Sequence, residues 1–259
     1  MAVNVNDVYT TVLYLLNKEQ RGYIQPDEFN KLATQVQLDI FQDYFSDANQ
    51  LVRKDQTNVQ NDTEFFNHVK NIEYKLYPFQ RQLSYTYDNT DQNWFSSEDV
   101  YKIGDVIATY TSQNPTIDSV SELTTNREYN FISRSRLTAP TKKFPLHTID
   151  RRVDATSENI TSTLKIYPLP SSVSCNVLIN PSKVFWGYNV GTLGQFLYNN
   201  TLYDETTNPL GSLNFQLDIS EQNNIIIRIL KYCGVVISDP QVVAIANNEI
   251  QENQVNLKS

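Results

Sequence analysis

The sequence LNKEQRGYIQPDEFNKLATQVQLDIFQDYF, residues 16–45, decides how the rest of the chain is interpreted. It supports two incompatible interpretations. If Asn17 is the first position of an EF-hand calcium loop, Gly22 and Glu28 fall where the loop needs a turn-forming glycine and a bidentate glutamate. The other interpretation is a helix, a tight turn and a second, capped helix, which needs no metal.

The calcium interpretation is the weaker of the two. An EF-hand also needs oxygen ligands at its first, third and fifth positions, which hold Asn17, Glu19 and Arg21, and the arginine brings positive charge to the ion. No second copy of the pattern occurs, although EF-hands generally come in pairs. We therefore expect no metal site, and a calcium-binding, EF-hand-like regulatory module over residues 17–28 stays an alternative.

The helical interpretation explains the same residues. Apolar residues at helical spacing over 7–16 predict a first helix, and Gly22 suits its stop because glycine adopts left-handed backbone without strain. Pro26 then opens a helix, and Asp27 and Glu28 favour the positive end of its dipole. The stripe that follows predicts packing on a core: Phe29, Leu32, Ala33, Val36, Ile40, Phe41 and Tyr44, with Gln35, Gln37, Asp39 and Asp43 on the opposite face.

Further along, the apolar period changes twice. A third helix is expected over 62–76, before Pro78. Alternating and β-branched segments then predict strands, the last two joined as an antiparallel hairpin by Pro168 and Pro170: residues 83–89, 105–111, 128–133, 162–167 and 174–179. Helical spacing returns in two segments that begin near residues 219 and 239.

These elements predict an α+β fold. The N- and C-terminal helices form a helical bundle with an inserted antiparallel β-sheet or sandwich region, because neither set of helices can bury its apolar stripe alone. We place N-terminal helices of the bundle in residues 1–80, the β-rich inserted region in 81–215, and the C-terminal helices and tail that complete the bundle in 216–259.

Composition narrows the classes of function. The 259 residues are 40% apolar, enough for a sizeable core, and the net charge of -8 argues against DNA binding by charge attraction. No apolar run is long enough to span a membrane, and the N-terminus lacks the pattern of a signal peptide. Cys175 and Cys233 lie in apolar settings and are predicted to be buried free thiols.

The sequence carries no catalytic pattern. His68 and His147 have no neighbours that indicate a triad or a metal site, and the 7 glycines form no phosphate-binding loop. Paired carboxylates such as Asp27 and Glu28 stand where a helix begins. We therefore predict that the protein is not an enzyme and has no catalytic residues, metal or cofactor.

One segment departs from the overall acidity. Aromatic residues Tyr129, Phe131 and Phe144 are interleaved there with seven basic residues: Arg127, Arg134, Arg136, Lys142, Lys143, Arg151 and Arg152. Three interpretations remain open, namely a nucleic-acid surface, a docking surface for an acidic protein partner, and ordinary solvated loop charge.

Residues 17–30, NKEQRGYIQPDEFN, resemble the N-terminal motif N-K-x-Q-x-G-x-[ILV]-x-P-x-[EQ]-F-N of head-to-tail connector (adaptor or ring) proteins of tailed bacteriophages, above all the crAss-like phage group. Later segments resemble the family in the same order: SRLTAPTKKFPLHTI (135–149), LKIYPLPSSVSCNVLINPSKVFWGY (164–188) and CGVVISDPQVVAIANNEIQEN (233–253). The resemblance touches both ends and the middle of the chain.

The resemblance implies a non-enzymatic structural virion protein of the neck or tail region, assembled in the host cytoplasm. Such subunits form a homo-oligomeric ring, commonly a dodecamer, that docks beneath the portal protein and joins capsid to tail. Further tail or ring proteins follow it, and genomic DNA passes through the lumen without specific binding. A tail-associated receptor- or carbohydrate-binding protein is the other alternative, because residues 198–215 are rich in Asn, Thr and Tyr.

For such a ring, we expect interface residues in three places. They are the basic segment, an aromatic pair and the polar tail: Arg134, Arg136, Lys142, Lys143, Arg151, Arg152, Trp186, Tyr188, Asn247, Glu249 and Glu252. Gly22 and Pro26 are expected to be structural turn residues.

The two interpretations of the opening segment predict different effects for two substitutions. Gly22→Val should lower the melting temperature or block assembly, because the turn needs the glycine conformation, whereas Glu28→Gln should change little. Thermal unfolding of both variants and calcium titration followed by Tyr and Trp fluorescence measure this. A micromolar calcium response that Glu28→Gln abolishes would restore the metal interpretation.

Overall fold

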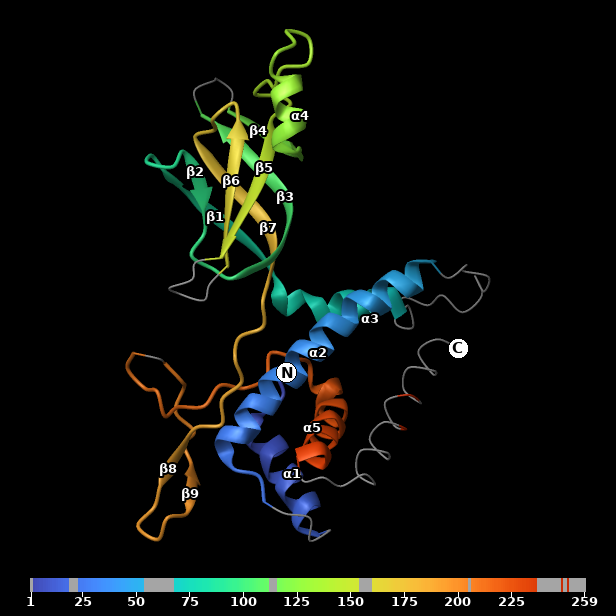
Figure 1. Cartoon of the computed structure of the whole chain (residues 1–259), viewed down its shortest axis with the longest axis vertical. Coiled ribbons are helices and arrows are strands. Elements are labelled where there is room, and N and C mark those ends of the chain that lie inside the picture. Colours follow the sequence, from blue (N-terminus) through green and yellow to red (C-terminus); the bar gives the residue numbers. More distant parts are fainter. Residues whose placement is uncertain are drawn as a thin grey trace. The chain divides into compact units, whose positions relative to one another are not determined.

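Both ends of the chain belong to one structural unit, Met1–Pro78 with Pro181–Ser259, and the residues between them, Phe79–Asn180, form a second unit (Figure 1). The structure, a computed structural model, describes residues 2–18, 23–53, 68–111, 116–153, 160–204, 206–236, 248 and 251. The first unit is called the helical unit below and the second the barrel unit.

The helical unit contains four α-helices in the described residues: α1 (Val5–Lys18), α2 (Pro26–Arg53), α3 (His68–Leu76) and α5 (Gln222–Val236). Helix α5 packs against α1 and α2, and α2 also contacts α3. The predicted stripe of α2 is buried apart from half-buried Leu32, and α5 contributes Ile225, Ile229 and Cys233 to the same core. Short 3-10 helices, η2 (Tyr77–Phe79) and η3 (Ile219–Glu221), follow α3 and precede α5.

The start of α2 confirms the capped helix. Pro26 is its first residue, and the Glu28 carboxylate accepts a hydrogen bond from the Gln25 backbone N–H at 3.3 Å. A glutamate at the third helical position often closes a helix N-terminus in this way. Gly22, the turn residue expected just before it, lies outside the described residues.

One residue that the sequence placed on the polar face of α2 is buried. Gln37 is 1% exposed: its Nε2 donates to the Ser182 carbonyl at 2.7 Å, and its Oε1 accepts from the Gln216 N–H at 2.8 Å. A periodic pattern separates an apolar from a polar face, but it cannot show that a second chain segment covers the polar face. An amide can be buried there because both of its ends are hydrogen-bonded.

Two further α2 residues continue this contact along an extended segment, residues 182–186. Thr34 exchanges hydrogen bonds with the backbone of Val184 at 3.1 and 3.3 Å. Buried Asn30 accepts from the Trp186 N–H at 2.7 Å and donates to its carbonyl at 3.4 Å. We call this row of side-chain-to-backbone bonds from α2 the clamp.

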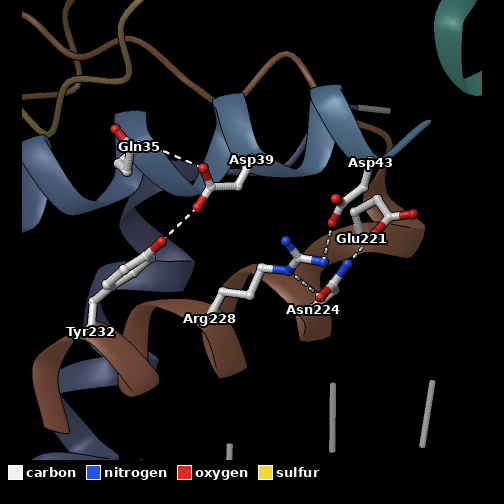
Figure 2. A network of polar contacts seen from close by, with 7 residues as sticks. All are labelled: Gln35, Asp39, Asp43, Glu221, Asn224, Arg228 and Tyr232. Atoms are coloured by element: carbon white, nitrogen blue, oxygen red, sulfur yellow. Dashed lines mark hydrogen bonds and ion pairs between the residues drawn. The ribbon is translucent and has the colours of Figure 1, made fainter. Parts of the chain in front are cut away.

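Asp39 and Asp43, which the sequence placed on the same polar face, bind α5, as Figure 2 shows. Tyr232 donates to Asp39 at 2.7 Å, and Arg228 donates to Asp43 at 2.6 Å and to Asn224 at 3.0 Å. The sequence indicated an amphipathic helix, but it could not show that α5 lies along the polar flank of α2.

The polar network extends to α3 through a buried carboxylate. Glu221 accepts from Lys75 at 2.6 Å and from Asn224 at 2.9 Å. Burial raises the pKa of this carboxyl, but the hydrogen bonds from Lys75 and Asn224 outweigh it, so the pKa lies below its usual value. The carboxylate is therefore charged at neutral pH and joins α3 to α5.

Seven strands of the barrel unit close a barrel in the order β1-β2-β6-β5-β4-β3-β7, with β7 pairing back to β1 (Figure 1). All neighbours are antiparallel except β4 and β5, which pair in parallel over two residues. The strands are β1 (Gln80–Asp88), β2 (Asn93–Phe95), β3 (Val100–Tyr110), β4 (Ile117–Leu123), β5 (Leu146–Val153), β6 (Ile160–Tyr167) and β7 (Ser172–Ile179).

The predicted fold class is therefore wrong. A closed seven-stranded barrel, with five α-helices in the described residues, replaces the helical bundle with an inserted antiparallel sheet or sandwich. Alternation shows which side of a strand is buried, but not whether the edge strands of a sheet meet. Closure also uses β2, β4 and β5, which the sequence did not predict, and β3 bends at register shifts near Lys102 and Ile103.

Two local predictions in this unit were also wrong. Residues 128–133, expected as a strand, lie mostly in helix α4 (Asn126–Ile132), because Thr125 and Glu128 form a complete capping box. The expected hairpin of β6 and β7 does not form: β6 pairs with β5 and β2, and β7 with β1 and β3. The Pro168 carbonyl of the connection accepts a hydrogen bond from the Tyr110 hydroxyl at 2.7 Å.

Inside the barrel lies a buried pair, Ser121 and His147. The Ser121 hydroxyl donates to the Val106 carbonyl at 3.1 Å, which leaves its oxygen to accept from His147 Nδ1 at 2.8 Å. Burial lowers the pKa of His147, while the hydrogen bond to Ser121 opposes that change. The imidazole is therefore neutral in the folded protein at neutral pH.

This histidine makes the stability of the barrel depend on pH. The folded-state pKa of His147 lies below its unfolded value of about 6.5. The contribution of the neutral imidazole to the free energy of unfolding is therefore fully present above pH 6.5, and it is lost as the pH falls from there through the folded-state pKa. We expect the melting temperature to fall between pH 7.5 and 5.5, and to fall less in His147→Gln. Equal losses in both proteins would contradict a buried neutral histidine. Thermal unfolding across this pH range measures the difference.

Candidate assembly surfaces

An arm, residues Gly187–Leu217, leaves the core of the helical unit directly after the clamp. Its first part is a two-stranded hairpin of β8 (Tyr188–Val190) and β9 (Phe196–Tyr198), which projects away from the helices (Figure 1). An isolated two-stranded hairpin is only marginally stable in water. The hairpin therefore depends on what holds its base.

Aromatic stacking holds that base. Trp186 is 4% exposed, and its ring lies 4.4 Å from the Tyr9 ring of α1, 5.9 Å from Tyr188 and 5.7 Å from Tyr198. Its indole N–H donates to the Asn6 side chain at 3.1 Å. These contacts join both hairpin strands to α1.

A tightly packed glycine lies beside this stack. The Gly187 N–H donates to the Ser212 hydroxyl at 2.9 Å, and the Gly187 carbonyl accepts from the Asn199 N–H at 2.9 Å. A methyl group at Gly187 would lie 2.2 Å from the Leu210 carbonyl oxygen. Two passes of the arm therefore meet here at a distance that excludes any side chain at this position.

Beyond this base, the hairpin exposes apolar side chains. Leu193 at the turn is 90% exposed, and Val190, Phe196 and Leu197 are also exposed. Burying one leucine side chain stabilises a protein or a complex by about 1.5–3 kcal/mol, and the free hairpin lacks this stabilisation. Clustered exposed apolar residues on a well-anchored element are typical of a contact surface for another protein.

A second exposed surface, the tip, comprises residues Thr125–Pro145 of the barrel unit. Helix α4 and the following loop extend beyond one end of the barrel (Figure 1). Tyr129 stacks on Tyr167 of β6 with ring centroids 3.9 Å apart, and the Ser119 hydroxyl donates to the Lys142 carbonyl at 2.9 Å. The tip is therefore attached to the barrel at both of its ends.

The tip combines apolar and basic side chains. Leu137 is 97% exposed, and Phe131 and Phe144 are also exposed. The side chains of exposed Arg127, Arg134 and Arg136 make no hydrogen bond or ion pair with any residue that the structure describes. Its single acid, Glu128, is occupied by the α4 cap, and hydrogen bonds from Thr125 lower its pKa.

The structure brings some of the predicted interface residues together on the tip. Arg134, Arg136 and Lys143 are exposed there, while Lys142 is half-buried. Arg151 and Arg152 lie on β5 with side chains outside the described part. Buried Trp186 supports the hairpin, and half-buried Tyr188 donates to Asp27 at 3.3 Å. Residues of the polar tail, Asn247, Glu249 and Glu252, lie outside the described residues.

Sequence reasoning missed the most exposed residues of both surfaces, Leu193 and Leu137. Each is a single leucine in a polar loop, so periodicity gives no signal for it. The run Gly191–Gln195, with glycines on both sides of Leu193, is a turn signal from which a hairpin tip could have been predicted.

The described residues hold no arrangement that indicates catalysis or metal binding. No group of three or more His, Cys, Asp or Glu side chains that could hold a metal occurs among them. Ser121 and His147, a residue pair used by some hydrolases, lie inside the barrel, and the serine hydroxyl is already engaged. Both cysteines are buried free thiols, as predicted, and burial raises the pKa of each to about 12.

Comparison with known proteins leaves the chain without an assigned family. No protein-family model matches it, and the search of curated proteins gave no match. Among the described helices, none is long and apolar enough to cross a membrane.

The base of the hairpin generates a test. Gly187→Ala should lower the free energy of unfolding by about 1–3 kcal/mol, because the added methyl group meets backbone atoms that cannot move independently. Gly191→Ala is the matched control, since there the methyl group meets only the flexible Gln195 side chain. Urea unfolding followed by Trp fluorescence measures both. Equal stabilities would contradict the close approach at Gly187.

Proposed function

We propose that this chain is a non-enzymatic structural virion protein, a subunit of a head-to-tail connector ring that docks beneath the portal of a tailed bacteriophage. The observation that carries the proposal is the anchored hairpin with an exposed apolar end. The Trp186 stack and the tight packing at Gly187 fix its position, so Leu193 is presented to a partner at little conformational cost. The sequence resemblance supplies the identity of the assembly.

A ring also requires particular surfaces on each subunit. A head-to-tail ring needs two different surfaces on each subunit, because each copy contacts its two neighbours through opposite sides. The hairpin and the tip are two such surfaces, one on each unit, and they differ in both composition and charge. A self-complementary dimer would need only one.

The charge distribution suits a DNA conduit. The helical unit has 18 Asp and Glu against 11 Lys and Arg by sequence, so it carries -7 of the net charge of -8. A wall with this charge repels a DNA backbone and lets it pass without specific binding. Five of the 21 Lys and Arg lie on the tip, against a single acid.

No specific observation favours the calcium-binding module or the carbohydrate-binding protein, the two alternatives. Glu28, which would be the bidentate calcium ligand, instead accepts the hydrogen bond that caps α2. In the Asn- and Thr-rich segment, Asn208 donates to Thr201 at 2.7 Å and to the Leu202 carbonyl at 2.7 Å. Asn199 accepts from Thr201 at 2.7 Å. These polar side chains therefore bind one another within the arm.

Reconstitution with the portal protein of the same phage tests the proposal. Native mass spectrometry and electron microscopy of the mixture should show several copies of the chain on each portal, arranged in a ring. Leu193→Asp should reduce ring occupancy, whereas Tyr74→Asp, an exposed aromatic residue of α3, should not. A protein that stays monomeric and ignores the portal would contradict the proposal. A monomer without the portal contradicts nothing, since the portal can template the ring.

A further inference from the structure

We infer that the tip docks on an acidic protein surface, where exposed Leu137 enters an apolar hollow and the arginines of the tip meet Asp and Glu side chains around it. This inference deepens the proposed function and rests on it, because it gives the chemistry of the subunit that the tip would contact in the assembly.

The loop that presents Leu137 is held by its own hydrogen bonds. The Ala139 N–H donates to the Ser135 carbonyl at 2.9 Å, which closes a turn around Leu137. The Thr138 hydroxyl and the Ser135 N–H both donate to the carbonyl of Ile132, the last residue of α4, at 3.2 Å each. Because the loop is joined to α4 in this way, a partner that covers Leu137 needs to order little additional chain.

The basic side chains of the tip that are free to bind a partner are arginines. Arg127, Arg134 and Arg136 are exposed and have no hydrogen-bonding or charged partner among the described residues. Lys143, by contrast, lies over the Phe144 ring, with its Nζ 5.7 Å from the ring centroid. A guanidinium group can bind a carboxylate through two parallel hydrogen bonds, and it is more weakly hydrated than an ammonium group. Arginines therefore suit a contact that excludes water.

The tip and its border stay positive when every nearby acid is counted. Residues 110–149 carry five Lys and Arg against three acids, a net charge of +2 in a chain of -8. The acids are Asp118, Glu122 and Glu128. Two of them have local partners, since Glu128 caps α4 and Asp118 accepts from the Thr109 hydroxyl at 2.8 Å. The complementary surface is therefore one with an excess of Asp and Glu.

The composition of the tip favours a protein over a nucleic acid or a lipid bilayer. Leu137 is 97% exposed, and an aliphatic side chain offers no ring on which a base could stack. Exposed Glu122 borders the tip, because its N–H donates to the Pro145 carbonyl at 3.0 Å. A uniformly anionic surface would be repelled by this acid, whereas a protein can place its carboxylates opposite the arginines alone. Apolar side chains together with arginines are also typical of protein–protein interfaces.

Site-specific photo-cross-linking in infected cells tests this contact. Leu137 is replaced by the photoreactive residue p-benzoylphenylalanine, and Tyr74 of α3, also exposed, is replaced in the same way as the positional control. After irradiation the full-length chain is purified under denaturing conditions, and the cross-linked peptide is sequenced by mass spectrometry. We expect position 137 to cross-link to a peptide with more Asp and Glu than Lys and Arg, at a yield at least about fivefold above that at position 74.

Charge reversal shows whether the arginines make the contact. Arg134→Glu combined with Arg136→Glu should lower the cross-link yield about tenfold. Lys31→Glu combined with Arg81→Glu reverses two exposed basic residues outside the tip, and it should leave the yield unchanged. Replacing an Asp or Glu of the cross-linked peptide by Arg should restore the yield of the reversed tip, because opposite charges then face each other again.

A cross-link to nucleic acid or lipid would overturn the inference. So would a contact peptide without an excess of acids, or a yield at position 137 no higher than that at position 74. An acidic peptide supports it whether the peptide belongs to a neighbouring copy or to another virion protein. The outcome is separable from that of the proposed function. A ring on the portal whose tips do not cross-link leaves the function and removes this contact, whereas an acidic contact made by a chain that never joins a portal does the reverse.

Discussion

The structure of the helical unit depends on the clamp, in which one face of α2 binds the backbone of the extended segment 182–186. Asn30, Thr34 and Gln37 are four and three residues apart, so their side chains lie on one helix face. Four helical residues rise about 6 Å and two extended residues about 6.6 Å, so successive side chains meet alternate peptide groups. On its other edge the segment pairs with the chain through Phe185 and Leu213, at 3.1 and 2.7 Å. The helix thus serves as one neighbouring strand, which satisfies backbone groups that would be costly to bury alone.

The clamp also connects the ends of the chain to the arm. It holds the segment that follows the barrel unit against a helix from the beginning of the sequence, and the hairpin starts directly after its last contact, at Trp186. The polar network of Asp43 and Arg228 then joins α5 to the same helix. An exposed apolar hairpin is useful for assembly only if its position is fixed, and the clamp with the aromatic stack at Trp186 supplies that constraint.

The sequence predicted the features that are encoded locally. The stripe from Phe29 to Tyr44, the capped start of α2 and the two buried thiols follow from periodicity and from residue chemistry. It could not predict features that need distant partners. The burial of Gln37 could not be predicted because its partners, Ser182 and Gln216, are more than 140 residues away. The sequence did not predict barrel closure for the same reason. Closure depends on pairing between β1 and β7 and on short strands with weak patterns. The basic segment of the tip was found, but the exposed leucines that complete both surfaces carry no periodic signal.

The proposed connector ring is most directly tested in an assembled particle. Cryo-electron microscopy of the neck of a phage particle that contains this chain would locate each unit. The account predicts a ring beneath the portal in which Leu193 of each copy is buried against another protein subunit. A neck that lacks the chain, or a ring in which the hairpin faces solvent, would contradict it.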